Sequence, residues 1–415
     1  MNVSKSLYIL VLVLGMFLVV PSESQDRLSC ENIPEPTFWI EGSPGPWGSG
    51  NPFYETRTSF RKKLISYLNT NPSSLPQLKS VFSQQELEVE KHVRALIEAK
   101  MIRTLRVQNE ESVYAPTFAI LSVSDFELMG SDMLCTAQDY ADKMCEDKAR
   151  LDRILADAGL DSTYRLPVFL GLIRDKFFYN YMDEKKLFPR EDGVCSQNGK
   201  GNFYGAVCYE PLGSKMIYGI THAMKNNLSI LYIHDFFNSD SLFESWGLRE
   251  LWEAKHVFSD IIDFLERDDP RTKTEIERKF RGRKGGEHIS SMLSYLADQK
   301  VIVALNNGYV KNSIRLDRNT MTRLEEVSAE AAGEIAKFVE SEEFADLYRQ
   351  TTSGENNVSL HEFREVVAWQ IIWATPGLLA ERGFFEEVGT EPPELYIFER
   401  DKTIMQEILE FLRIK

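Results

Sequence analysis

The sequence is poor in the residues that build metal centres and nucleophilic active sites. Its 415 residues include only 6 histidines and 5 cysteines, and none of them has the CxxC or HExxH spacing of a zinc site. The GxSxG turn of serine hydrolases is absent, as are the GxGxxG and GxxxxGK[ST] loops that bind nucleotide phosphates. These absences argue against the common motif-bearing enzymes, and we expect neither a cofactor nor a metal ion.

Positive charge is also scarce. Lys and Arg number 48 against 63 Asp and Glu, which gives a net charge of −15. A chain this acidic is repelled by nucleic-acid phosphates unless a basic face is segregated locally, and it gains little from anionic membranes. The 43% hydrophobic residues are ordinary for a folded protein, and the length favours two to four domains. Composition therefore argues mildly against nucleic acid as a partner.

Long apolar runs are missing except at the N-terminus. There Lys5 precedes an apolar run from Leu7 to Val20, and small residues, Ser22 and Ser24, follow at the positions that a signal peptidase prefers. The run is shorter than the roughly 20 residues of a membrane span. We expect residues 1–24 to be a cleaved signal peptide of a secreted or periplasmic protein with no other membrane span. The alternative is an uncleaved membrane anchor, which also places the remainder outside the cytoplasm.

The cysteines predict at most one obvious disulfide. Cys195 and Cys208 flank a Gly- and Asn-rich stretch that suits a hairpin-like loop, so a bridge between them is plausible in an oxidising compartment. Cys135 and Cys145 lie near or on one helical pattern, too far apart to bridge each other. The odd number leaves at least one thiol free or paired between chains.

The pattern of apolar residues predicts an α+β fold that is mainly helical. Runs with helical period dominate, and aromatic-rich, strand-like runs gather in the middle of the chain. We divide the chain into a signal peptide (1–24), an extended linker or arm (25–56), a first small unit (57–125), a helix followed by a mixed α+β region (126–249), a second small unit (250–320) and a C-terminal helical region (321–415).

Three segments share one ending. The runs LIEAKMI (96–102), LADQKVI (296–302) and LAERGFF (379–385) each close a helical pattern with apolar residues that enter a strand-like run. In the second, Asn307-Gly308 suits a tight hairpin turn. This arrangement resembles the winged helix-turn-helix superfamily, in which three helices pack and a two-stranded wing closes the core. The resemblance implies unit 1 at 57–125, unit 2 at 250–320 and a third such unit in 321–415.

Winged helices usually read DNA with the third helix, but the charges here do not favour that activity. The third helix of unit 1 mixes carboxylates with its cations. Unit 2 carries a basic run before its third helix, which could grip phosphates or an acidic protein. The glycines beside it also fit a solvated turn. The candidate binding residues are Lys279, Arg281, Arg283 and Lys284.

The middle of the chain holds the one candidate for a catalytic cluster. His234 and Asp235 end a strand-like run, and His222 ends another. Such residues could act as acid and base or bind a metal ion, which leaves a hydrolase as one alternative. No third ligand stands at a metal-binding spacing, so hydrogen-bonded structural roles also fit. His361-Glu362 resembles half of a zinc-protease motif, but Glu365 replaces the second histidine.

The sequence therefore predicts an exported, non-catalytic interaction module built on winged-helix-like units. Its expected partner is an unidentified protein or cell-surface component, contacted through acidic faces. A hydrolase in the central region and nucleic-acid binding through the basic run of unit 2 are the alternatives. Two sequons, at Asn227 and Asn357, are open to glycosylation.

Overall fold

A computed structural model describes 291 of the 415 residues. The described residues are 39–44, 52–56, 58–82, 86–108, 111–188, 201–207, 219–225, 228–234, 257, 259–283, 286–385 and 394–400. The signal peptide, Asp235, Lys284, Cys195, Cys208 and Asn227 lie outside them.

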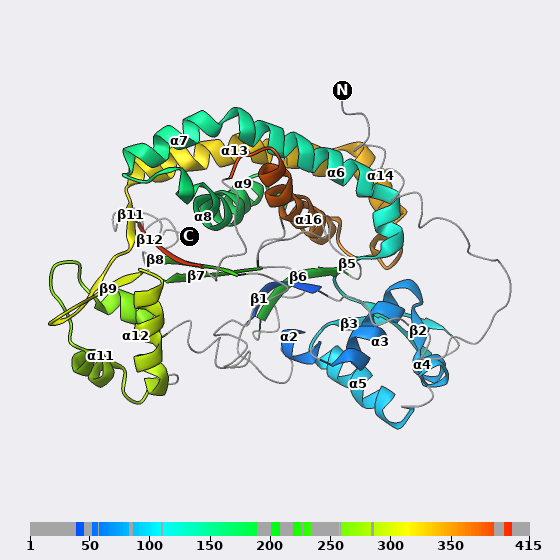
Figure 1. Ribbon diagram of the computed structural model, residues 1–415. Coiled ribbons are helices and arrows are strands. Elements are labelled where there is room, and N and C mark those ends of the chain that lie inside the picture. Colours follow the sequence, from blue (N-terminus) through cyan, green and yellow to red (C-terminus); the bar gives the residue numbers. More distant parts are fainter. Residues whose placement is uncertain are drawn as a thin grey trace, which may run out of the picture.

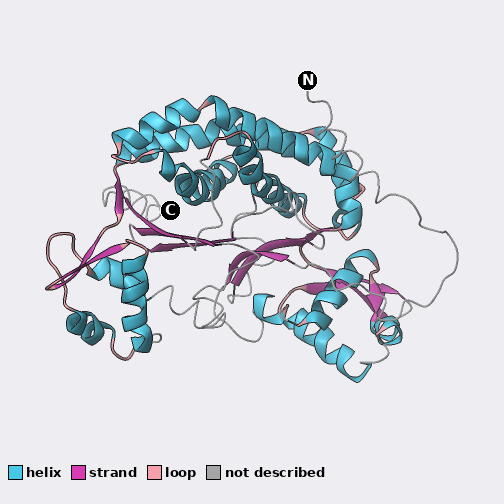
Figure 2. Cartoon of the chain, viewed as in Figure 1, coloured by secondary structure: helices cyan, strands magenta, loops and turns pink. Residues whose placement is uncertain are grey.

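The protein is mainly helical with several small sheets, which confirms the α+β class at that level. Figure 1 shows a layer of long helices above two small sheets, with a helix-and-hairpin group beneath each end of the layer. We keep the names unit 1 and unit 2 for these two groups. Figure 2 shows two sheets, drawn in magenta, between the helical layer and the small units, which hold further strands of their own.

Unit 1 consists of three helices closed by a three-stranded antiparallel sheet. The strands stand in the order β2-β4-β3, so the strand between the first two helices pairs with the return strand of the hairpin. The elements are α3 (Ser59–Thr70), β2 (Ser73–Ser74), α4 (Leu75–Val81), α5 (Glu86–Glu98), β3 (Ile102–Gln108) and β4 (Glu111–Pro116).

Helical periodicity explains the core of unit 1. Leu64, Ile65 and Leu68 recur on one face of α3 and are fully buried, as their spacing predicts. Helix α5 buries its valines and Leu96 on one face, whereas Ile97 is 42% exposed. The side chain of Ile97 lies one position beyond the buried face, at the end of the helix.

Unit 2 repeats this order of elements. Residues 259–264 are helical, and Arg271 then forms a single β-bridge to Tyr309 in the hairpin. The hairpin residues pair antiparallel, and a separate hydrophobic core fills the unit. The remaining elements are α11 (Lys273–Phe280), α12 (Ile289–Asp298), β9 (Ile302–Leu305) and β10 (Gly308–Lys311).

The turn of this hairpin differs by one residue from the predicted turn. Gly308 pairs with Leu305, so the turn residues are Asn306 and Asn307 rather than Asn307 and Gly308. Gly308 has a φ of 147°, and a Cβ there would lie 2.5 Å from the carbonyl oxygen of Arg271. The glycine is therefore required by the close approach of the Arg271 backbone, not by the turn itself.

The shared ending of the three segments is a shared helix C-terminus. Lys100 and Lys300 both have a φ of 55°, and Gly383 has a φ of 65°. In each case the following amide donates back to a leucine carbonyl five residues earlier, at 2.8 Å for Met101, 2.9 Å for Val301 and 2.9 Å for Phe384. This is the hydrogen-bond pattern of a Schellman cap, in which one residue takes the left-handed conformation.

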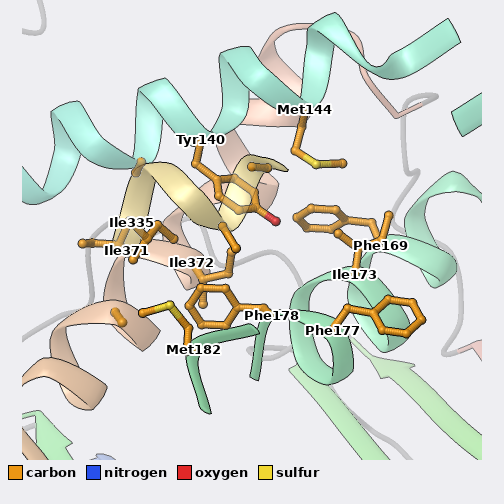
Figure 3. Packing of buried hydrophobic residues seen from close by; sticks show 14 of the residues in the cluster. Tyr140, Met144, Phe169, Ile173, Phe177, Phe178, Met182, Ile335, Ile371 and Ile372 are labelled. Atoms are coloured by element: carbon orange, nitrogen blue, oxygen red, sulfur yellow. The ribbon is translucent and has the colours of Figure 1, made fainter. Parts of the chain in front are cut away.

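Two long helices and their neighbours form what we call the helical body. Figure 3 shows its core, where Tyr140 and Met144 of α6 meet Phe169 and Ile173, with Ile335 and Ile371 nearby. The helices of the body are α6 (Val123–Glu146), α7 (Lys148–Asp157), α8 (Arg165–Val168), α9 (Phe178–Glu184), α13 (Arg318–Glu340), α14 (Glu342–Arg349), α15 (Thr352–Glu355) and α16 (Leu360–Glu381).

Two segments of helical period in the body are each divided into two helices. Helix α6 begins at Val123 and gives way to α7 after Asp147. Helix α13 ends before Ser341, whose side chain caps α14. The segment Phe169–Phe177 is π-helical, and the α-helix α9 that follows buries Phe178 and leaves Tyr179 and Tyr181 half-buried.

The central strands belong to two further sheets. Strand β6 (Gly201–Val207) lies between β1 (Trp39–Pro44) and β5 (Ala119–Leu121), so part of the predicted arm is a strand that pairs with the middle of the chain. The other sheet has the order β11-β12-β8-β7. Its strands are β7 (Gly219–Lys225), β8 (Leu228–His234), β11 (Ile314–Leu316) and β12 (Glu394–Arg400).

The third expected repeat is arranged differently from units 1 and 2. Its helix, α16, packs with α6 and β6 in the body rather than in a separate small core. The next described strand, β12, pairs antiparallel with β8 and parallel with β11. Within the described residues, the resemblance of this segment is limited to the helix C-terminus.

Candidate functional site

The two histidines of the predicted catalytic cluster lie on adjacent strands. His222 in β7 pairs with Leu231, and His234 at the end of β8 pairs with Gly219. The two positions are therefore three steps apart along the ladder, and successive positions of a strand alternate between the faces of a sheet. This register places the two positions on opposite faces of the ladder, which does not favour a shared site, and the assignment of His222, His234 and Asp235 to one site stays a prediction.

The predicted basic segment of unit 2 is only partly free to bind an anion. Arg283 forms an ion pair with Asp260, and its guanidinium lies 5.5 Å from the ring centre of Phe280. The ammonium of Lys279 lies 5.6 Å from the ring centre of Phe264. Both cations are therefore held against unit 2 itself, although Arg281 extends into solvent.

A shallow depression lies beside this segment, between α11 and α12. Its volume is about 700 Å³. One side carries Arg281 and Arg283, but Glu277 lies on the other side and accepts a 3.1 Å hydrogen bond from the hydroxyl of Ser290. A carboxylate in the wall offsets part of the positive charge, so the depression is not a clear anion site.

The third helix of unit 2 has no basic side chain on its exposed face. That face carries three serines and one carboxylate, none of which attracts phosphate. The hairpin that follows is apolar instead: Val303 is 41% exposed and Leu305 is 45% exposed. The exposed residues of α12 are Ser290, Ser291, Ser294 and Asp298.

We call Val303, Ala304 and Leu305 the apolar edge of unit 2. All three are exposed on β9, so three consecutive residues of this strand face solvent. Sequence reasoning identified the hairpin but missed this surface. The uninterrupted apolar run Val301–Leu305 is typical of a strand buried on both faces, so it carries no signal of this exposure.

The third helix of unit 1 carries cations that are already paired. Lys91 lies 3.0 Å from Glu88, and Arg94 lies 3.4 Å from Glu90. The same carboxylate of Glu90 also lies 3.2 Å from Lys79 in α4. Phosphates would have to compete with these carboxylates, so this face is poorly suited to a nucleic-acid backbone.

Unit 1 is fastened to the helical body by a hydrogen-bonded joint. The side-chain amide of Asn356 donates to the carbonyl of Asn69 at 2.8 Å, and Asn69 donates to the hydroxyl of Thr352 at 3.0 Å. Arg103 of β3 donates to the carbonyls of Asn356 and Asn357, at 3.0 and 2.7 Å. The base of the unit 1 hairpin therefore contacts the body through Arg103, whereas Thr104 and Arg106 further along β3 are exposed.

A buried carboxylate completes this joint. Asp125, at the start of α6, accepts from the amide and the hydroxyl of Thr352, both at 2.9 Å. It also accepts from the amide of Ser122 at 2.9 Å, which closes the N-terminus of α6. Because a buried charge is costly unless it is hydrogen-bonded, these contacts give Asp125 a structural role.

Unit 2 is joined to the central sheet at its opposite end. Glu399 of β12 lies 3.4 Å from the ammonium of Lys311 and 4.0 Å from Arg267, and it also accepts from Ser313. Apolar contacts from Leu228 and Ile397 extend the core of unit 2 into the sheet. This attachment leaves the apolar edge uncovered.

The helical body holds a buried phenol, that of Tyr140. Burial raises the pKa of the Tyr140 phenol above its usual range, and the hydroxyl has no hydrogen-bond partner among the described residues. Figure 3 shows this side chain enclosed by the core. Among the described residues, no group of three or more His, Cys, Asp or Glu could hold a metal ion. His361 is exposed, whereas Glu365 is fully buried.

Both described cysteines are free thiols. Cys135 is exposed and Cys145 is half-buried, and both lie within α6, as expected. Burial raises the pKa of the Cys145 thiol, which lowers its reactivity. Within the described part of the chain, no helix combines the length and apolarity needed to cross a membrane.

Comparisons with known proteins give no further guide. No family model, curated protein or solved structure matches this chain. The candidate site must therefore be argued from its own residues, and the apolar edge of unit 2 is the strongest.

Proposed function

We propose that the protein is an exported, non-catalytic interaction module, and that units 1 and 2 are winged-helix-like units adapted to bind protein. The order helix, strand, helix, helix, strand, strand in both units supports the winged-helix assignment, as does the β2-β4-β3 sheet of unit 1. The N-terminal sequence supports export. The third expected unit lacks this support.

One observation carries the proposal of protein binding. Val303 and Leu305, on the hairpin of unit 2, are 41% and 45% exposed, while α12 beside them exposes no cation. An exposed apolar surface next to a polar rim is typical of a protein contact and gains nothing from phosphate. The partner is thus contacted at the apolar edge, not through acidic faces as the composition suggested.

A photo-crosslinking amino acid at Leu305 tests this function in the cells that make the protein. In the exported fraction, we expect the probe at position 305 to form crosslinked adducts with a protein. The same probe in place of Ile97, an equally exposed residue of unit 1, should form no adduct. In the V303E/L305E variant, a probe placed at Ala304 should also form no adduct. Sequencing the mature N-terminus in each fraction tests export separately.

The competing nucleic-acid function predicts a different result. Binding through Arg281 and Arg283 would give an affinity for duplex DNA that falls steeply with salt, with a slope that decreases in the R281A/R283A variant. We expect only weak binding at low salt and no change of slope. A steep salt dependence that needs these two arginines would replace our proposal.

A further inference from the structure

The apolar edge lies on a strand that, among the described residues, is paired on one side only. In the described part of the chain, β9 pairs only with β10, whose other side is bridged to Arg271. An outer strand presents backbone N–H and C=O groups that can template a further strand. Strand β9 contains no proline and no charged residue that would block such pairing.

The hydrogen bonds of β10 show which backbone groups of β9 face outward. Tyr309 exchanges both of its backbone bonds with Arg271, at 3.0 and 2.9 Å, and the Lys311 amide donates to Glu266 at 3.1 Å. These groups therefore point away from β9. Their cross-strand neighbours, Ala304 and Ile302, are in the non-hydrogen-bonded register and direct their own N–H and C=O to the open side.

The corresponding edge of unit 1 is protected. Strand β3 carries Arg103 and Arg106, and its pairing with β4 shifts register between Thr104 and Arg106. Charged side chains and bulges are the usual means of preventing edge pairing. Arg103 is also occupied by the joint to the helical body. Unit 2 has none of these features on β9, so its edge is chemically different.

We propose that β9 pairs antiparallel with β9 of a second copy of this chain, with Ala304 on the twofold axis. The inference rests on the proposed function, since it names the partner of the same apolar edge. The N–H and C=O of Ala304 bond to those of its counterpart, and Val303 lies opposite Leu305 of the other copy. A four-stranded sheet results, and the four exposed apolar side chains meet on one face.

Two features favour a second copy as the occupant. The edge is self-complementary, because a strand centred on Ala304 offers one donor and one acceptor to an identical strand. The charge distribution allows the approach: residues 257–311 hold ten Lys and Arg and nine Asp and Glu, although the whole chain carries −15. Two copies can therefore meet through residues 257–311, which are nearly neutral, while the acidic rest of each chain lies away from the contact.

The first test compares two substitutions of one residue by analytical ultracentrifugation. Ala304→Pro removes the outward N–H without breaking a bond to β10, and Ala304→Ser keeps that N–H. We expect the wild type and A304S to dimerise with rising concentration, and A304P to show an apparent dissociation constant at least tenfold higher. A monomeric wild type, or a dimer unaffected in folded A304P, overturns the inference.

A second test remains decisive if A304P fails to fold. Facing Cα atoms of a hydrogen-bonded antiparallel pair stand about 5.5 Å apart, within the range for a disulfide. In a Cys135→Ser background, A304C should form a covalent dimer under oxidised glutathione, which accepts two electrons as the two thiols lose their protons. The exposed control S294C should remain monomeric, and equal cross-linking of both variants contradicts the pairing.

The two proposals fail in different ways. If the chain is monomeric but the Leu305 probe still captures another protein, the self-pairing is wrong and the interaction function stands. If the Leu305 probe captures nothing and the chain does not dimerise, both fail. Dimerisation that A304P abolishes, with the probe at Leu305 joining two copies of the chain, supports both.

Discussion

Units 1 and 2 share an order of elements but use their hairpins in opposite ways. The base of the unit 1 hairpin is fixed to the helical body, where Arg103 donates to the carbonyls of Asn356 and Asn357. The hairpin of unit 2 extends away from the body and exposes Val303 and Leu305 (Figure 1). One framework thus serves as a fixed support at one end of the molecule and as an open contact at the other.

The difference arises from a few side chains rather than from the backbone. Polar residues at the ends of α3 and α15 allow unit 1 to form the joint, while the strand edge of unit 2 lacks polar residues. A fold therefore does not determine which of its surfaces is functional.

The largest expected effect comes from truncating one buried leucine in the core of each unit, at matched positions. Leu96 and Leu296 occupy the same place before the shared helix ending, and both are fully buried. Truncation of either to Ala should cost about 2–5 kcal/mol. Because unit 1 is fastened to the body, L96A should also increase hydrogen exchange around α15, whereas L296A should act within 257–311 and on β8 and β12, whose Leu228 and Ile397 belong to the same core. Equal effects on the body would remove the distinction between the units.

A smaller effect is expected from removing one hydrogen bond of the joint between unit 1 and the helical body. Asn356→Ala removes the 2.8 Å bond to the carbonyl of Asn69 and leaves that acceptor buried. The cost should be about 1–3 kcal/mol, measured by chemical denaturation. The matched control is Asn307→Ala in the exposed turn of unit 2, which should change stability by less than about 0.5 kcal/mol. If both variants behave alike, the joint does not stabilise unit 1.

A pH dependence should affect unit 1 and spare unit 2. Burial, and then the charge of Arg61, lowers the pKa of His92, whose Nδ1 accepts from Arg61 Nε at 3.0 Å. The neutral imidazole is thus the form that the fold prefers. Its contribution is present above the ordinary histidine pKa of about 6.5 and is lost as pH falls through the lowered value. Met292 holds the equivalent position in unit 2 and does not titrate.

Hydrogen exchange of each unit between pH 7 and pH 5 measures this response, after correction for the intrinsic rate. Unit 1 should open more readily at the lower pH, and His92→Gln should remove most of the change. An identical response in unit 2 would show that the effect does not come from this histidine.

Part of the fold could be predicted because local patterns carried the information. Helical period located α3 and the core face of 259–264, and the shared endings located two similar units. The turn at Asn306 and Asn307 was misplaced by one residue, because Gly308 is required by a backbone 37 residues earlier in the chain, at Arg271. Such a close approach has no local signature.

The candidate sites were harder to predict for the same reason. The histidines at 222 and 234 look like a pair in the sequence, and only the strand register shows that the two positions lie on opposite faces. The basic segment looked free until Asp260 and Phe264 were seen to hold Arg283 and Lys279. Conversely, the run Val301–Leu305 looked like an ordinary buried strand, and only its position at a sheet edge exposes it. Pairing and exposure depend on contacts between distant residues.

The smallest expected effect concerns the helix ending that the units share with α16. Lys300 takes a φ of 55°, a conformation that costs a residue with a side chain about 1–2 kcal/mol, although glycine loses more entropy on folding. Lys300→Gly should therefore raise stability, by a few tenths up to about 1 kcal/mol in denaturation. Gly383 already takes this conformation with open space around it, so Gly383→Ala should lower stability by a similar amount. If K300G raises the free energy of unfolding and G383A lowers it, glycine is favoured at this position of both helix endings, whether or not a hairpin follows. A lower free energy of unfolding in K300G would mean that the Lys300 side chain stabilises unit 2.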